Sequence, residues 1–147
     1  RVDRRQRQMC IRDRYRPDLI DQSIAKKNVN SLLEKAREVS ISACAQSGNN
    51  LIPQIQYYEN LDAFLSNSKE QVFVFDTKTR DSNTSDLQVK NSQASIFVLT
   101  GCESGFSIKE RKILQKQKKF FFRTNTLRAE TAIIVSCVAM KTIIGEL

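Results

Sequence analysis

The sequence of 147 residues contains no histidine. This absence excludes Ser-His-Asp and Cys-His catalysis, and it excludes every metal site that needs an imidazole ligand. The four cysteines, Cys10, Cys44, Cys102 and Cys137, lie far apart and form no C-x-x-C pair, so neither a zinc site nor a thioredoxin-like motif is expected. We therefore expect free thiols in a reducing cytoplasm and no bound metal.

Glycine and proline are also scarce, at 4 and 2 residues, while 40% of the chain is hydrophobic. This composition is typical of a globular domain. Long hydrophobic runs are missing, because the most apolar segment, residues 131–144, is interrupted by Ser136, Lys141 and Thr142. That segment is shorter than the roughly 20 apolar residues that span a bilayer, so it predicts a buried helix. No signal peptide and no membrane partner are expected.

Positive charge is concentrated at the start of the chain. The net charge is +8, and residues 1–16 hold seven arginines against two aspartates. The remainder, with 17 basic and 14 acidic side chains, is only mildly basic. Because residues 1–16 show no helical or strand period, we interpret them as a disordered basic arm, a remnant of cloning or a wrongly joined stretch, with an RNA-binding tail as the functional alternative. A single domain is expected over residues 17–147.

Hydrophobic periodicity predicts helices and strands that alternate along the chain. The clearest helix covers residues 28–46, where apolar side chains recur at i, i+3 and i+4 before Gly48 ends the pattern. The other predicted elements are a short helix at 62–66, a strand at 72–75, a surface loop at 76–86, a strand at 94–100, a helix from Ser107 to about residue 118, a strand at 120–122 and a helix at 130–144. A capping box formed by Ser107 and Glu110 predicts that a helix begins at Ser107. Alternation with nearly continuous apolar strands predicts an α/β fold with a mostly parallel sheet.

Two segments lie where ligands bind in open α/β sheets, beyond the carboxyl ends of strands. The first is residues 99–106 (LTGCESGF), in which Gly101 and Gly105 flank the carboxylate of Glu103. Glycine at such positions permits positive φ and lets backbone amides approach a ligand closely. A plain strand-to-helix turn accounts for the same residues equally well, so this segment alone decides nothing.

The second segment is residues 126–132 (TLRAETA), which opens the apolar last helix. Helix capping explains Glu130, because a carboxylate in the first turn meets the positive end of the helix dipole. Capping does not explain Arg128, because a cation at a helix N-terminus is unfavourable unless it has an anionic partner.

Taken in order, these segments resemble a known family. G-C-E-S-G-F at 101–106, then a helix, a strand and L-R-A-E-T-A at 127–132, are similar to the paired signatures of the ribosomal RNA small subunit methyltransferase E family of the SPOUT, or α/β-knot, superfamily. A-C-A-Q-S-G-N-N-L-I-P at 43–53 resembles a helix end of the same family. The resemblance covers about residues 22–147, which correspond to the C-terminal catalytic domain only. The family's N-terminal RNA-binding barrel is not recognisable.

The resemblance implies a SPOUT-type α/β domain with a parallel sheet and a C-terminal trefoil knot. It also implies S-adenosylmethionine as cofactor, a homodimer, and methylation of N3 of a uridine in small-subunit ribosomal RNA. The positions that match the family's cofactor site are Leu99, Thr100, Gly101, Cys102, Gly105, Phe122, Thr126 and Leu127. Cys102 stands where the family has proline and Ser104 where it has glycine. Phe122 and Arg123 stand where the family has a Leu-Gly pair before the last signature.

The matched signatures also suggest catalytic residues, namely Arg128, Glu103 and Glu130. N3 of uracil is weakly acidic and must lose its proton before it attacks a methyl group. A cation such as Arg128 stabilises the developing uracil anion, and Glu103 or a water molecule accepts the proton. Glu130 belongs to the signature beside the site.

Two other interpretations remain open. A non-catalytic or truncated knot domain would serve RNA association or dimerisation, and cofactor binding distinguishes it from an enzyme. An unrelated small α/β domain would use both motifs only as turn and cap signals. A dimer built on the helix at 130–144 disfavours this last interpretation.

Overall fold

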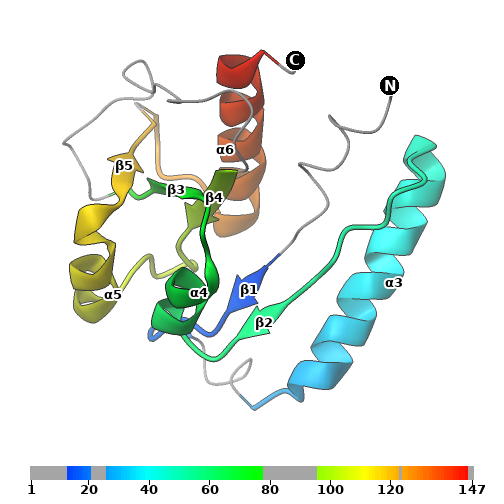
Figure 1. Ribbon diagram of the computed structural model, residues 1–147, viewed down its shortest axis with the longest axis horizontal. Coiled ribbons are helices and arrows are strands. Elements are labelled where there is room, and N and C mark those ends of the chain that lie inside the picture. Colours follow the sequence, from blue (N-terminus) through cyan, green and yellow to red (C-terminus); the bar gives the residue numbers. More distant parts are fainter. Residues whose placement is uncertain (1–12, 21–25, 78–95, 123, 146–147) are drawn as a thin grey trace. The chain divides into compact units, whose positions relative to one another are not determined.

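The computed structural model describes residues 13–20, 26–77, 96–122 and 124–145 (Figure 1). Contacts divide the chain into two compact units. Unit 1 comprises Arg1–Arg16 and Ile20–Ser66, and unit 2 comprises Pro17–Leu19 and Asn67–Leu147. Both units combine α-helix with parallel strands, so the predicted α/β class is confirmed. The knot and the domain boundaries stay predictions.

Unit 1 contains the helix α3, Val29–Ser47, and a parallel pair of short strands, β1 at Arg14–Tyr15 and β2 at Tyr57–Tyr58. Asn28 caps α3, because its side chain accepts a hydrogen bond from the Asn30 N–H at 2.9 Å. Gly48 ends the helix with a φ of 67°, which lies in the left-handed region that favours glycine. The predicted helix at 28–46 is therefore confirmed.

The rest of unit 1 agrees with the expectation in one element and differs from it in others. The short helix α4, Leu61–Asn67, matches the prediction at 62–66. Strand β1 lies inside residues 1–16, where no strand is predicted, because two residues are too few to show an alternating pattern. Residues 1–12 lie outside the described residues. The apolar stripe of α3 contains no buried side chain.

Unit 2 holds a three-stranded sheet in the order β4-β3-β5, and both pairings are parallel. The strands are β3 at Gln71–Phe75, β4 at Ile96–Thr100 and β5 at Lys118–Phe120. Because β3 is the central strand and is covered on both faces, its last four side chains are all buried. The strands predicted at 72–75 and 94–100 are thus present, and residues 94 and 95 lie outside the described part of the chain.

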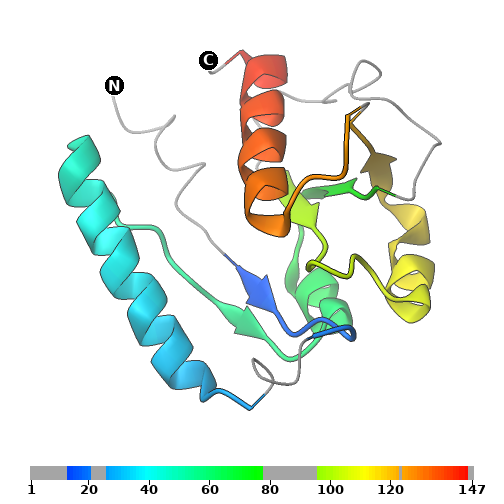
Figure 2. The same cartoon turned by 180° about the vertical axis from the view of Figure 1, so that it is seen from behind.

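A cluster of aromatic side chains forms the core between the sheet and the helix α6, Ala129–Ile144. Phe120 stacks on Phe73 with ring centroids 5.9 Å apart, and Phe75 stacks on Phe122 at 5.1 Å. Met140 of α6 completes the buried cluster. Burial of each such side chain contributes about 1.5–3 kcal/mol, so α6 is held against this face of the sheet (Figure 2).

The helix α5, Ile108–Ile113, and one 3-10 turn, Leu114–Lys116, connect β4 to β5. The predicted capping box is present: the Glu110 N–H donates to Ser107 Oγ at 3.0 Å, and the Ser107 N–H donates to Glu110 Oε2 at 2.7 Å. Asp18 joins this box, because its carboxylate accepts from Ser107 Oγ at 2.7 Å. The end predicted near residue 118 is wrong, since Lys118 already pairs with β3.

The third strand accordingly lies at 118–120 and not at 120–122. Lysines at an edge strand can keep their charged ends in water. A strand that begins with two lysines therefore lacks the apolar run from which a strand is predicted. Helix α6 agrees with the prediction at 130–144. Ser136 and Met140 face the sheet, whereas Ile134 and Val138 are 63% and 49% exposed. Most of the predicted loop at 76–86 lies outside the described residues.

Candidate functional site

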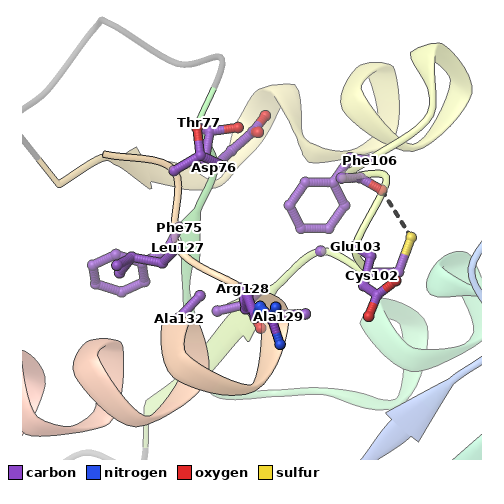
Figure 3. Close-up of a pocket in the computed structure, with 14 residues that line it drawn as sticks. Phe75, Asp76, Thr77, Cys102, Glu103, Phe106, Leu127, Arg128, Ala129 and Ala132 are labelled. Atoms are coloured by element: carbon purple, nitrogen blue, oxygen red, sulfur yellow. Dashed lines mark hydrogen bonds between the residues drawn. The ribbon is translucent and has the colours of Figure 1, made fainter. Parts of the chain in front are cut away.

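A pocket of about 560 Å³ lies in unit 2 at the carboxyl ends of β3 and β4 (Figure 3). Three segments line it: residues 75–77 at the end of β3, residues 100–103 and 105–106 after β4, and residues 126–129 with Ala132 at the start of α6. Parallel strands bring these segments together, because their carboxyl ends meet at one edge of the sheet. The volume lies within the range of about 300–1,000 Å³ that is typical of small-molecule and cofactor sites.

The loop after β4 is a tight turn. The Gly105 N–H donates to the Cys102 carbonyl at 2.8 Å, and the Cys102 thiol donates to the Gly105 carbonyl at 3.2 Å (Figure 3). Gly105 has a φ of 73°, whereas no non-glycine residue in the described ranges has a positive φ. Cys102 therefore restrains this loop through hydrogen bonds, and Ser104 adopts its place in the turn without left-handed strain.

Gly101 is required by a close approach of two backbone segments. A Cβ atom at this position would lie 3.0 Å from the Cα and carbonyl carbon of Gly105 and 3.2 Å from the Phe106 nitrogen. These neighbours are backbone atoms and cannot rotate away, so any side chain at 101 would displace the loop. The pocket wall here is consequently made of backbone groups, which can hydrogen-bond a ligand directly.

An ion pair joins the pocket wall to α5. Arg111 Nη2 lies 3.2 Å from Asp76 Oδ1, and these side chains are 26% and 5% exposed. A Cβ atom on Gly105 would lie 3.5 Å from Arg111 Nη2, so the second glycine borders the guanidinium. Asp76 follows β3 directly, and its N–H donates to the Phe120 carbonyl at 3.0 Å. This arrangement places a carboxylate in the wall, where it can accept hydrogen bonds from ligand hydroxyl or ammonium groups.

Arg128 occupies the N-cap position of α6 but makes no capping hydrogen bond with its side chain. Ser, Thr, Asp and Asn are favoured at this position because they accept from backbone N–H groups, which arginine cannot do. Arg128 is exposed and lines the pocket, and Figure 3 shows it with Ala129 on the side opposite Asp76 and Thr77. Capping therefore does not account for this arginine.

Comparison with known proteins assigns the chain to a family. A sequence model described as an RNA methyltransferase domain matches residues 16–141. The chain belongs to the RNA methyltransferase family. No curated protein is similar enough in sequence to count as a match.

The fold of this RNA methyltransferase domain is similar to that of a solved Legionella pneumophila protein, which is named as a methyltransferase and was solved with the bound cofactor SAM. The TM-score is 0.71 and the sequence identity is 22%. The match covers 87% of this chain and 53% of the other, so the chain spans about half the length of that protein.

Most of the site residues expected from the sequence of the RNA methyltransferase domain lie together in the pocket. These are Thr100, Gly101, Cys102, Glu103, Gly105, Thr126, Leu127 and Arg128. The structure does not bring Leu99, Phe122 or Glu130 into the pocket lining. Leu99 is buried within β4, Phe122 stacks on Phe75 in the core, and Glu130 is exposed in the first turn of α6.

Several residues of the pocket lining are not among the individual site residues expected from the sequence. They are Phe75, Asp76, Thr77, Phe106, Ala129 and Ala132. A signal existed for Asp76, because it is the first polar residue after a predicted buried strand that neighbours β4. Asp76 also begins the predicted surface loop at 76–86, and a residue in such a loop is not expected to line a pocket.

Neither a metal site nor a membrane span is found in the described residues. Within ranges 13–20, 26–77, 96–122 and 124–145, no group of three or more His, Cys, Asp or Glu side chains could hold a metal ion. Over these same ranges, no helix combines the length and apolar character needed to cross a membrane. Cys44, Cys102 and Cys137 are free thiols.

Proposed function

We propose that this chain uses S-adenosylmethionine to methylate N3 of a uridine in small-subunit ribosomal RNA. The observation that carries the proposal is the pocket in which residues 100–106 meet residues 126–132, although a helix and a strand separate them in the sequence. Membership in the RNA methyltransferase family supports the reaction class. The similarity of the two lining motifs to the E family supports the choice of uridine N3.

The residues present suit S-adenosylmethionine, which carries ribose hydroxyls, an ammonium, a carboxylate and an adenine. Backbone groups of the loop at 101–105 suit polar edges, and the Asp76 carboxylate suits hydroxyl or ammonium donors. Phe106, Leu127 and Ala132 supply apolar surface to the same pocket. When bound, the cofactor supplies a methyl group on a positively charged sulfur.

The protein's own residues then act on the uracil. Arg128 holds a positive charge beside the pocket and stabilises the negative charge that develops on the base. Glu103 is exposed in the loop that follows β4, and it accepts the N3 proton, with water as the alternative acceptor. Glu130 interacts with the helix dipole and positions the start of α6. Holding the base in line with the methyl group removes much of the entropic barrier.

Calorimetric titration of S-adenosylhomocysteine into the purified chain tests the cofactor site. We expect binding in the micromolar range for the wild type and no binding for Gly101→Val, because the valine side chain displaces the loop backbone. Ser104→Ala is the matched control, since Ser104 is exposed in the same loop and does not line the pocket. Circular dichroism establishes that each variant is folded.

Absence of heat from folded wild-type protein would overturn the enzyme proposal and favour a non-catalytic or truncated knot domain. Where binding is found, transfer of a labelled methyl group to small-subunit ribosomal RNA, followed by nucleoside analysis, tests the N3 position.

The same proposal includes a homodimer, a trefoil knot in the C-terminal segment and a cytoplasmic location. Ile134 and Val138 support the dimer, because they lie one turn apart on α6 and are largely exposed. The ribosomal RNA substrate is the basis for the cytoplasmic location.

A further inference from the structure

A basic segment follows the pocket loop and belongs to neither signature. Residues 109–119 contain six lysines or arginines and one acidic residue, Glu110, which is buried in the capping box. The rest of the chain after residue 16 contains 11 basic and 13 acidic residues. The excess positive charge of residues 17–147 is therefore located entirely in this segment.

Three of these lysines share one face of α5 and its 3-10 extension. Lys109, Lys112 and Lys116 recur at i, i+3 and i+7, the spacing of side chains on one side of a helix. All three are exposed, whereas Glu110 and Leu114 on the other side are buried. Among the residues that the structure describes, none forms an ion pair with these lysines. Within the described ranges, no acidic side chain therefore neutralises these three charges.

Two of the three other basic side chains of the segment contact groups of the fold. Arg111 pairs with Asp76, and the Lys118 ammonium lies 5.6 Å from the centre of the Phe73 ring. These contacts have structural roles and separate both residues from the face formed by Lys109, Lys112 and Lys116.

An exposed apolar side chain stands at the end of this face nearest the pocket. Ile108 is 79% exposed and lies one helical turn before Lys112, so the two share a side of α5. It is separated only by Ser107 from Phe106, which lines the pocket. We define Ile108, Lys109, Lys112 and Lys116 as the lysine face.

We propose that the lysine face binds the sugar-phosphate backbone of a single-stranded RNA segment adjoining the nucleotide that enters the pocket. This inference rests on the proposed RNA methylation and adds the surface that holds the substrate. Lysine ammonium groups bind phosphate as point charges, and such contacts fix position without reading sequence. The three lysines extend over about 10 Å from the pocket side, judged by the rise of a helix.

The exposed isoleucine favours a single strand over a duplex. In a duplex the bases are stacked inside, whereas a single strand can place an unstacked base or ribose against an apolar side chain. Ile108 offers that surface directly beside the lysines, so the lysine face combines electrostatic and apolar contacts.

Fluorescence anisotropy with a labelled single-stranded RNA, measured over a range of salt concentrations, tests the lysine face. The variant carries Lys109→Ala, Lys112→Ala and Lys116→Ala together, and alanine preserves the helix. The matched control carries Lys26→Ala, Lys27→Ala and Lys35→Ala, which removes the same charge from exposed positions of unit 1.

Each phosphate contact on a single strand contributes about 0.7 to the salt slope, so loss of three contacts reduces the slope by about 2 and the affinity at 0.1 M salt by about a hundredfold. We expect this loss in the lysine-face variant and much less in the control. Ile108→Ser is expected to weaken binding a few-fold without changing the slope. Equal affinities and slopes for the lysine-face variant and the wild type would overturn the inference.

Titration of S-adenosylhomocysteine into the same preparations separates this inference from the proposed function. Weakened RNA binding by the lysine-face variant supports the RNA surface even where the cofactor does not bind. Normal cofactor binding together with unchanged RNA binding leaves the enzyme proposal intact and rejects the lysine face.

Discussion

At the scale of single residues, Arg111 connects α5 to two segments of the pocket wall. Its guanidinium pairs with Asp76 at the end of β3 and borders Gly105 in the loop after β4, while its backbone belongs to α5. A larger residue than glycine at 105 would require an unfavourable positive φ, although its Cβ atom would be only in ordinary van der Waals contact with this guanidinium. Arg111 is thus a positioning residue for a wall it does not itself line.

We expect Arg111→Met to lower the free energy of unfolding by about 1–3 kcal/mol, because a mostly buried carboxylate loses a charged hydrogen-bond donor. Cofactor affinity is expected to fall as well, since Asp76 is no longer held against the loop. Urea denaturation followed by circular dichroism measures the first effect. Lys112→Met is the matched control for stability, because Lys112 is exposed and unpaired in the described structure.

At the scale of elements, the capping box determines where α5 begins. Ser107 accepts from the Glu110 N–H and donates to Asp18, so one hydroxyl joins the helix start to residues 17–19. Ser107→Ala is expected to reduce stability by about 1 kcal/mol, and Ser107→Thr to preserve most of it. Thermal unfolding measures both, with a fall of about 3 °C expected for the alanine variant. Equal melting temperatures for the alanine variant and the wild type would show that the cap is dispensable.

Elements with strong local signals could be predicted from the sequence, and elements determined by distant contacts could not. Gly48 and the Ser107–Glu110 pair allow helix ends to be predicted, because a helix cap depends only on residues that are close in sequence. Strand β5 begins two residues before its predicted position, because Lys118 joins the sheet by pairing with Phe73. No local pattern reveals that pairing.

The same distinction holds for the site. The glycine motif at 101–106 and the arginine motif at 127–132 predict much of the pocket lining, because the carboxyl ends of strands converge in a parallel sheet. The Asp76–Arg111 pair joins residues 35 apart in sequence, and nothing near either residue predicts the other. Leu99 and Phe122 are not part of the pocket lining, because Leu99 is buried in β4 and Phe122 stacks on Phe75, so their contact with a cofactor stays a prediction.

At the scale of the whole molecule, the exposed side of α6 determines the expected assembly. Ile134 and Val138 present apolar surface, which proteins usually cover in a complex. Light scattering at micromolar concentration is expected to give a dimer for the wild type and a monomer for Ile134→Glu combined with Val138→Glu. Ile108→Glu, on α5, is the control and should remain dimeric. A monomeric wild type would contradict the proposed homodimer.

The strand order has a consequence for the growing chain during translation. Strand β3 is central but is synthesised before both of its neighbours, β4 and β5. The pocket is complete only when residues 126–132 have been added, because they supply its last wall. A ligand stabilises only the state that binds it. A nascent chain that stops before α6 therefore gains no protection from the cofactor, and ligand binding selects finished chains over partial ones.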